Sequence, residues 1–164
     1  MNAKNITLHA VLVALTVSLS LLVIIPVPAT NGLVTLCEVG IYTSALLLGA
    51  RSGLLVGASS GLLIDLISGY PQWIIFSLII HGAQGYLAGK IGFQRGNQWK
   101  IAGLLIAGVV MIIGYTIAGT LLYGFGSGIA SIPGNIVQNG FGYFMTIPLV
   151  TALKRVPAIR NSLN

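Results

Sequence analysis

Residues 101–122 read IAGLLIAGVVMIIGYTIAGTLL, a run of apolar and small side chains without a charged residue. An α-helix needs about 20 such residues to cross the hydrocarbon core of a bilayer. Because no water reaches that core, only helices and closed barrels satisfy all their backbone hydrogen bonds there, and a run of this length matches a helix. The stretch therefore predicts a membrane-spanning helix.

The composition of the whole chain agrees with this prediction. Of the 164 residues, 55% are hydrophobic and 6% are charged, whereas a soluble domain carries about 25% charged residues. The eight Lys and Arg residues stand between apolar runs and form no basic stripe of the kind that binds nucleic acid. Cys37 is the only cysteine, so we expect no disulfide within the chain and no metal site. A soluble domain and a nucleic-acid-binding protein are thereby excluded.

Five further apolar runs, separated by Pro, Gly and polar residues, complete the predicted fold. We expect a single all-α membrane domain over residues 1–164, a bundle of six transmembrane helices. The expected helices cover about residues 6–25, 38–49, 53–67, 73–93, 101–122 and 132–153.

Two segments differ from a simple membrane-spanning helix. The run 38–49 would rise only about 18 Å against a hydrocarbon core of about 30 Å. We therefore expect residues 29–37 to continue it as a loop packed within protein, with some thinning of the bilayer around it. Residues 124–128 read GFGSG and predict a flexible loop.

The basic residues predict the orientation of the bundle. With six helices, they all fall at the termini or at the even-numbered turns, and the other three loops contain none. They are Lys4, Arg51, Lys90, Arg95, Lys100, Lys154, Arg155 and Arg160. Because basic residues concentrate on the cytoplasmic side, both termini are predicted to be cytoplasmic.

Polar residues within the apolar runs gather toward the opposite, outer side. Such groups are costly in a membrane and usually face a cavity or another helix. We expect an outward-facing pocket lined by the last three helices and covered by the loops around Glu38 and Tyr70. The candidate binding residues are Glu38, Tyr70, His81, Gln84, Tyr115, Asn135, Gln138, Asn139 and Tyr143.

Several of these residues have an alternative structural interpretation. His81 and Gln84 are equally explained by a hydrogen bond that joins helices. Glu38 suits the N-terminus of a helix, Asp65 is better explained by a local cap or pair, and Tyr70 and Trp73 suit an interfacial aromatic belt. The three carboxamides after residue 132 share one helix face, which exceeds what packing requires.

No catalytic motif fits the predicted fold, so we expect a protein that is not an enzyme. Residues 57–61 (GASSG) match the G-x-S-x-G string of serine hydrolases, but that motif requires a strand–turn–helix and this string lies within a predicted helix. The glycine-rich segment 124–128 lacks the Lys and Ser/Thr of a phosphate-binding loop. A pocket without chemistry or an energy source suggests a binding subunit of a larger transporter.

Several short segments resemble the S components of energy-coupling factor (ECF) vitamin transporters. They are residues 25–30 (IPVPAT), 35–40 (TLCEVG), 65–73 (DLISGYPQW) and His81-Gly82, together with the Ala10-x-x-x-Ala14 pair in the first helix. The resemblance covers essentially the whole chain. It points to the riboflavin-type group, and within that group it is closest to the hydroxymethylpyrimidine or pyridoxine type.

The resemblance implies partners and a location. It implies a multi-pass protein of a prokaryotic plasma membrane that captures a vitamin and docks on a transmembrane coupling subunit through Ala10 and Ala14. Two ATP-binding cassette subunits would complete the complex and use ATP, and this chain itself would bind no cofactor.

The sequence leaves open both the substrate and one competing class of membrane protein. The candidate residues suit a small, flat, hydrogen-bonding ring such as hydroxymethylpyrimidine or pyridoxine. Riboflavin is larger, and the thiamine cation would need more acidic or aromatic groups. A self-contained channel or facilitator is the competing class, but it would need a continuous polar path that the cytoplasmic half does not offer.

Overall fold

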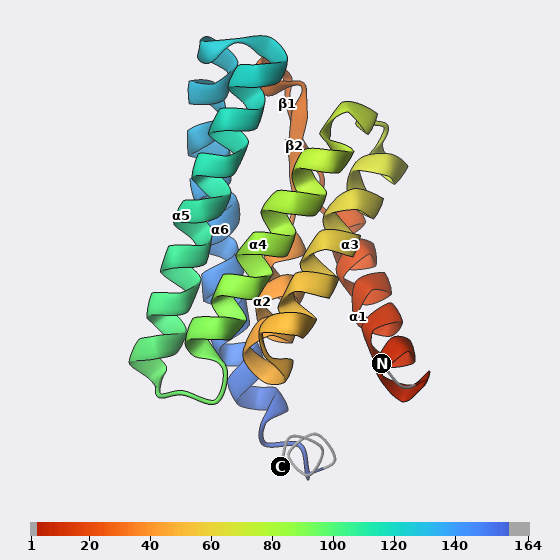
Figure 1. The fold of residues 1–164 in the computed structure, drawn as a ribbon, viewed down its shortest axis with the longest axis vertical. Coiled ribbons are helices and arrows are strands. Elements are labelled where there is room, and N and C mark those ends of the chain that lie inside the picture. The colour runs from red at the N-terminus through yellow and green to blue at the C-terminus, as the bar shows by residue number, and fades with distance from the viewer. Residues whose placement is uncertain (1–2, 158–164) are drawn as a thin grey trace.

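The structure is a computed structural model, and it describes residues 3–157 as a bundle of six α-helices (Figure 1). Five of these helices are long and apolar enough to cross a membrane, and the sixth, α2, is shorter. The helices are α1 (Ala3–Leu22), α2 (Cys37–Leu48), α3 (Ala50–Ser68), α4 (Ile74–Gly92), α5 (Asn97–Tyr123) and α6 (Phe125–Leu153). The predicted all-α membrane bundle is confirmed.

A small hairpin replaces the loop expected between the first two helices. Strands β1 (Ile25–Val27) and β2 (Gly32–Val34) pair antiparallel, with Ile25 opposite Val34. The 3₁₀ turn η1 (Pro28–Thr30) connects them. Helix α1 consequently ends at Leu22 rather than at residue 25, because the chain is already extended where β1 begins.

The prediction of a flexible loop at residues 124–128 is wrong. Helix α5 continues to Tyr123 and α6 begins at Phe125, so only Gly124 interrupts them, with a φ of 90° that glycine adopts without strain. Helix α5 also begins earlier than expected, at Asn97, because residues 97–100 form its first turn rather than a loop. Polar composition alone did not reveal that these segments extend the helices.

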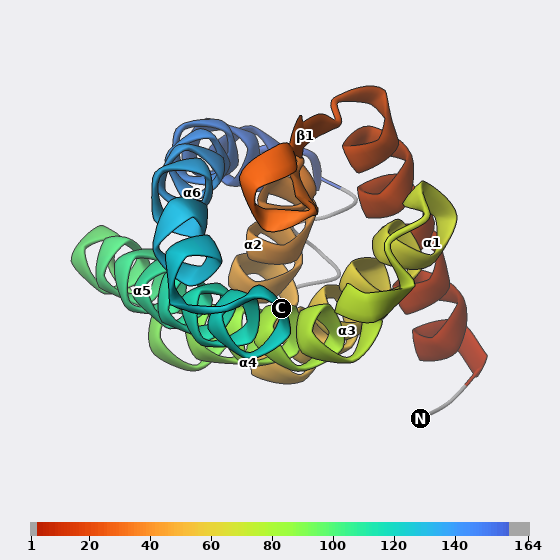
Figure 2. The same cartoon turned by 90° about the horizontal axis from the view of Figure 1, so that it is seen from above.

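Helix α2 lies at the centre of the bundle, where Figure 2 shows the other helices around it. It contacts α1, α3, α4 and α6, and most of its 12 residues are buried. Val34 and Thr35, which precede it, are buried as well. A short helix is therefore continued by a segment packed within protein, as the sequence predicts.

Helices α3 and α4 make the most extensive helix pair, and small residues bring their backbones together. A Cβ atom added at Gly57 would overlap the carbonyl oxygen of His81, and one at Gly53 would overlap that of Gly85. Glycines that permit such close approach are common between membrane helices. This contact fixes His81 at one depth relative to α3.

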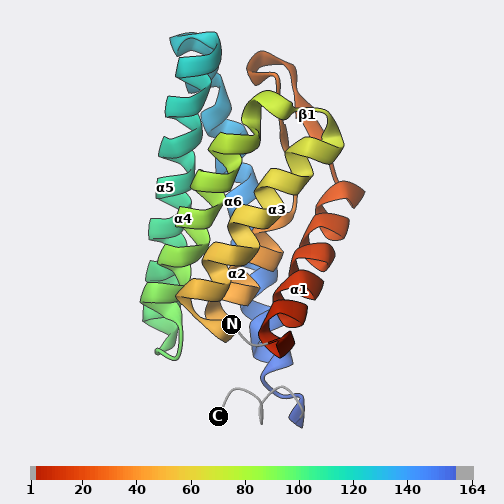
Figure 3. The same cartoon turned by 45° about the vertical axis from the view of Figure 1, so that its right-hand side comes forward.

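The described basic residues lie at one end of the bundle. The N-terminus of α1, the α2–α3 turn, the α4–α5 turn and the C-terminus of α6 share that end, which is the lower one in Figures 1 and 3. The hairpin and the α3–α4 and α5–α6 turns lie at the opposite end. Arg160 falls outside the described residues. The arrangement fits the predicted orientation, with the lower end toward the cytoplasm.

Candidate binding pocket

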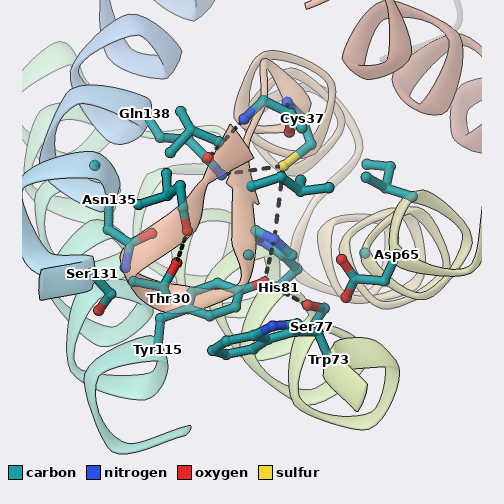
Figure 4. Close-up of a pocket in the computed structure, with 18 residues that line it drawn as sticks. Thr30, Cys37, Asp65, Trp73, Ser77, His81, Tyr115, Ser131, Asn135 and Gln138 are labelled. Atoms are coloured by element: carbon teal, nitrogen blue, oxygen red, sulfur yellow. Dashed lines mark hydrogen bonds between the residues drawn. The ribbon is translucent and has the colours of Figure 1, made fainter. Parts of the chain in front are cut away.

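A pocket opens beneath the hairpin, at the end of the bundle opposite the basic residues. The hairpin covers it, and α2 to α6 and η2 (Pro71–Trp73) supply the remaining walls. The space between these walls is about 590 Å³, including the part that is open to solvent. The polar lining residues are Thr30, Thr35, Asp65, Ser77, His81, Tyr115, Ser131, Asn135 and Gln138 (Figure 4).

Hydrogen bonds from η2 and to α6 hold the hairpin over the pocket. The indole Nε1 of Trp73 donates to the carbonyl oxygen of Asn31 at 2.8 Å, and the backbone N–H of Thr35 donates to Oε1 of Gln138 at 2.9 Å. Trp73 is only 4% exposed, so it belongs to the pocket wall rather than to an interfacial belt. The cover is thus the hairpin itself, and Tyr70 packs against the apolar cluster that contains Trp73.

His81 is held by hydrogen bonds at both ring nitrogens. Its Nδ1 lies 2.8 Å from Oε1 of Gln84, and its Nε2 lies 2.9 Å from the hydroxyl of Tyr115. Because an amide oxygen only accepts, Nδ1 carries a proton and donates to Gln84. The Tyr115 hydroxyl also forms a hydrogen bond with the Ser77 hydroxyl at 2.7 Å. The imidazole is therefore fixed in orientation.

A second layer of polar residues lies behind this wall. Nε2 of Gln84 donates to the hydroxyl of Tyr42 at 2.7 Å, and that hydroxyl donates to Oδ1 of Asn139 at 2.6 Å. Asn139 in turn donates through Nδ2 to the backbone oxygen of Asn135 at 2.9 Å. Gln84, Tyr42 and Asn139 are all buried, so this layer supports the pocket rather than facing a ligand.

Glu38 is fully buried beside the floor of the pocket. Nε2 of Gln138 donates to its Oε1 at 2.8 Å, the Cys37 thiol donates to its Oε2 at 3.3 Å, and Nδ1 of His81 lies 3.8 Å from Oε1. The sequence suggested that Glu38 lies near a loop that covers the pocket, but the structure places it in the first turn of α2. It anchors Gln138, which in turn holds the exit of the hairpin.

Cys37, Glu38 and His81 also form a grouping that the spacing of the sequence did not reveal. Their potential ligand atoms lie within 4.8 Å of one another, because α2 and α4 bring distant residues together. However, both ring nitrogens of His81 already have hydrogen-bond partners. This arrangement favours a hydrogen-bonded cluster over a metal centre, and the sequence-based expectation of no metal remains a prediction.

The structure separates the candidate residues into three groups. His81, Tyr115, Asn135 and Gln138 line the pocket, whereas Glu38, Gln84 and Asn139 lie directly behind its walls. Tyr143 stacks on Tyr42, with ring centroids 5.6 Å apart, and like Tyr70 it stands outside the lining. The lining residues that were not selected from the sequence include Thr30, Asp65, Trp73, Ser77 and Ser131.

Of these, Asp65 had the clearest signal in the sequence. It is one of only two acidic residues in the chain, and it falls within an apolar run. Intramembrane acids usually mark functional positions, but the adjacent turn made a local cap the simpler explanation. The backbone carbonyl of Asp65 accepts from the Tyr70 N–H at the end of α3, whereas its carboxylate interacts with Ser77 on α4, so its side chain does not act as that cap.

The chain matches a known protein family over nearly its whole length. The family model described as "ECF-type riboflavin transporter, S component" matches residues 1–155. The chain belongs to this family. It is therefore a subunit of a transporter in a prokaryotic plasma membrane, and its family works with ECF transmembrane and ATPase subunits. The S component resemblance noted from the sequence is confirmed.

Two relatives of this S component narrow the comparison. The chain is 41% identical over 155 residues to the "Thiamine precursor transporter HmpT" of Lactococcus lactis subsp. cremoris, covering 94% of this chain and 90% of that protein. It is 34% identical over 135 residues to an uncharacterized protein of Pyrococcus woesei, covering 77% of this chain and 90% of that protein.

Proposed function

We propose that this S component captures hydroxymethylpyrimidine, a precursor of thiamine, on the outer side of the membrane. The observation that carries the proposal is a pocket with one aromatic side and several polar groups. Trp73 and Tyr115 lie with ring centroids 5.7 Å apart and offer surfaces for a flat heterocycle. The relative named as a thiamine precursor transporter supports the same substrate class.

A panel of ligands tests this proposal. Isothermal titration calorimetry of the purified protein is expected to give the tightest binding for hydroxymethylpyrimidine, by at least about tenfold over riboflavin, thiamine and pyridoxine. A tenfold preference corresponds to about 1.4 kcal/mol, roughly one well-placed hydrogen bond. Equal or tighter binding of riboflavin would contradict the proposal. Neither the matching family description nor the relatives reported above name pyridoxine.

Transport is proposed to depend on partner subunits that bind and hydrolyse ATP, with no cofactor bound by this chain. Ala10 and Ala14 lie on the exposed side of α1, Ala10 in the half nearer the basic end and Ala14 just past the middle of the helix. Small side chains there allow a partner helix to approach closely. We therefore assign docking on the coupling subunit to this alanine face, and two ATPase subunits would complete the complex.

The interior below the pocket argues against a self-contained channel. Within residues 3–157, a cluster of buried side chains fills the bundle between the pocket and the basic end. It comprises Tyr42, Ala45, Leu46, Leu47, Ala88, Leu104, Ala107 and Val150. Such packing leaves no continuous polar path for a solute, so release to the inside requires a change of the whole subunit within a complex.

A further inference from the structure

Most polar groups around the pocket already use their hydrogen-bonding capacity within the protein. His81 is engaged at both ring nitrogens, and Gln138 is engaged at both its oxygen and its nitrogen. The hydroxyls of Thr30 and Ser131 donate to backbone carbonyls of their own turns. These residues shape the pocket but have little capacity left for a ligand.

Asp65 and Asn135 are the exceptions. Among the residues that the structure describes, Oδ2 of Asp65 and Nδ2 of Asn135 are buried atoms without a hydrogen-bond partner. The two side chains are only 6% and 7% exposed. Both line the pocket, Asp65 from α3 and Asn135 from α6, and Figure 4 shows them on opposite sides of it. Buried polar groups without a partner are rare in native structures and call for an explanation.

The chemistry of Asp65 defines the ligand group that would complete it. An ionised carboxylate only accepts hydrogen bonds, so the ligand must present a donor on that side. The polar neighbours of Asp65 are Ser77 and His81. Among the described residues, no Lys, Arg or His side chain forms an ion pair with this carboxylate. An amino group beside a ring nitrogen suits it well, because N–H donors pair with a carboxylate through strong, directional hydrogen bonds.

We propose that Asp65 selects an amino-substituted pyrimidine over its oxo counterpart, by accepting a hydrogen bond from the exocyclic amine while Asn135 binds the opposite edge of the ring. This inference rests on the proposed function and names the residue that makes the substrate choice. Trp73 and Tyr115 bound the space between the two polar walls, where the flat ring would lie.

Rejection of the oxo compound follows from the same geometry. An oxo group in place of the amine would turn an acceptor toward the acceptor Oδ2 of Asp65. The two oxygens would then face each other with no hydrogen between them, and sites built around a hydrogen bond discriminate strongly against analogues that lack it. An asparagine at position 65 has nearly the same size but offers an N–H donor, so it would accept the oxo group.

Calorimetry with two ligands tests the proposal. Dissociation constants are measured for hydroxymethylpyrimidine and for its 4-oxo analogue, on the wild type, Asp65→Asn and Asn135→Leu. The wild type is expected to prefer the amino compound by at least about tenfold. Asp65→Asn should weaken binding of the amino compound about 10- to 100-fold and shift the preference toward the oxo compound. Asn135→Leu, the matched control, should weaken both ligands without moving the preference.

The outcomes separate this inference from the proposed function. If the wild type binds the amino compound but Asp65→Asn weakens both ligands equally, Asp65 is structural and only this inference fails. If the wild type binds neither pyrimidine, both fail. If Asp65→Asn does not fold, NMR of ¹⁵N-amino-labelled hydroxymethylpyrimidine on the wild type replaces it. A downfield shift of the bound amine protons is then expected, and amine protons that keep their free shift would overturn the inference.

Discussion

Replacing Ala14 with tryptophan is expected to abolish uptake while leaving ligand binding at the wild-type level. Ala14 lies on the exposed side of α1, outside the lining of the pocket. An indole at this position would hold a partner helix away from α1, because close packing of membrane helices depends on small side chains. The fold of the isolated subunit should tolerate the change, since position 14 faces outward.

Two measurements on the same variant check this expectation. Co-purification with the coupling and ATPase subunits should fail for Ala14→Trp, and ATP-driven uptake into proteoliposomes should fall to background. Calorimetry of the isolated subunit should give an unchanged dissociation constant. Leu22→Trp is the matched control, because Leu22 is 80% exposed on the same helix but lies at its outer end. Assembly of Ala14→Trp at the wild-type level would remove the alanine face from the docking surface.

Replacing Gln138 with leucine is expected to weaken ligand binding about 10- to 100-fold. Gln138 accepts a hydrogen bond from the Thr35 N–H and donates one to Glu38, so it joins the hairpin exit, α2 and α6. Leucine would leave a buried N–H and a buried carboxylate oxygen without these partners. Each such loss costs about 1–3 kcal/mol. Part of that cost would lower the affinity for the ligand, because the hairpin would close less well over the pocket.

Gln72→Leu provides the matched control for Gln138→Leu. Gln72 also reaches the hairpin, through a longer contact of 3.4 Å from its Nε2 to the carbonyl oxygen of Asn31, but this contact is exposed. Its loss should change the dissociation constant by less than about threefold, because water replaces an exposed partner at little cost. Equal effects of the two substitutions would show that Gln138 has no special role in closing the hairpin.

The sequence predicted the features that depend on segment length and charge. Runs such as residues 101–122 identified the helices, the short run 38–49 identified α2, and the basic residues identified one end of the bundle. The boundaries were less accurate, because residues 97–100 and 125–131 are polar or glycine-rich yet extend helices. The hairpin was missed because each strand has only three residues, too few for a recognisable alternation.

The sequence identified the polar residues near the pocket but not their separate roles. Asn135, Gln138 and Asn139 share one helical face, yet Asn139 lies behind the wall because Tyr42 and Gln84 engage it. Which of several neighbouring polar groups remains free depends on helix depth and rotation, and spacing along the chain does not report these. Trp73 and Asp65 were underestimated for the same reason.

The most direct measurement is the identity of the small molecule that the protein retains. The S component is purified from cells supplied with equal concentrations of hydroxymethylpyrimidine, pyridoxine, riboflavin and thiamine, and the extracted ligand is identified by mass spectrometry. The expected result is hydroxymethylpyrimidine at about one molecule per chain, as one pocket implies. Riboflavin, thiamine or pyridoxine as the retained ligand would contradict the proposed substrate.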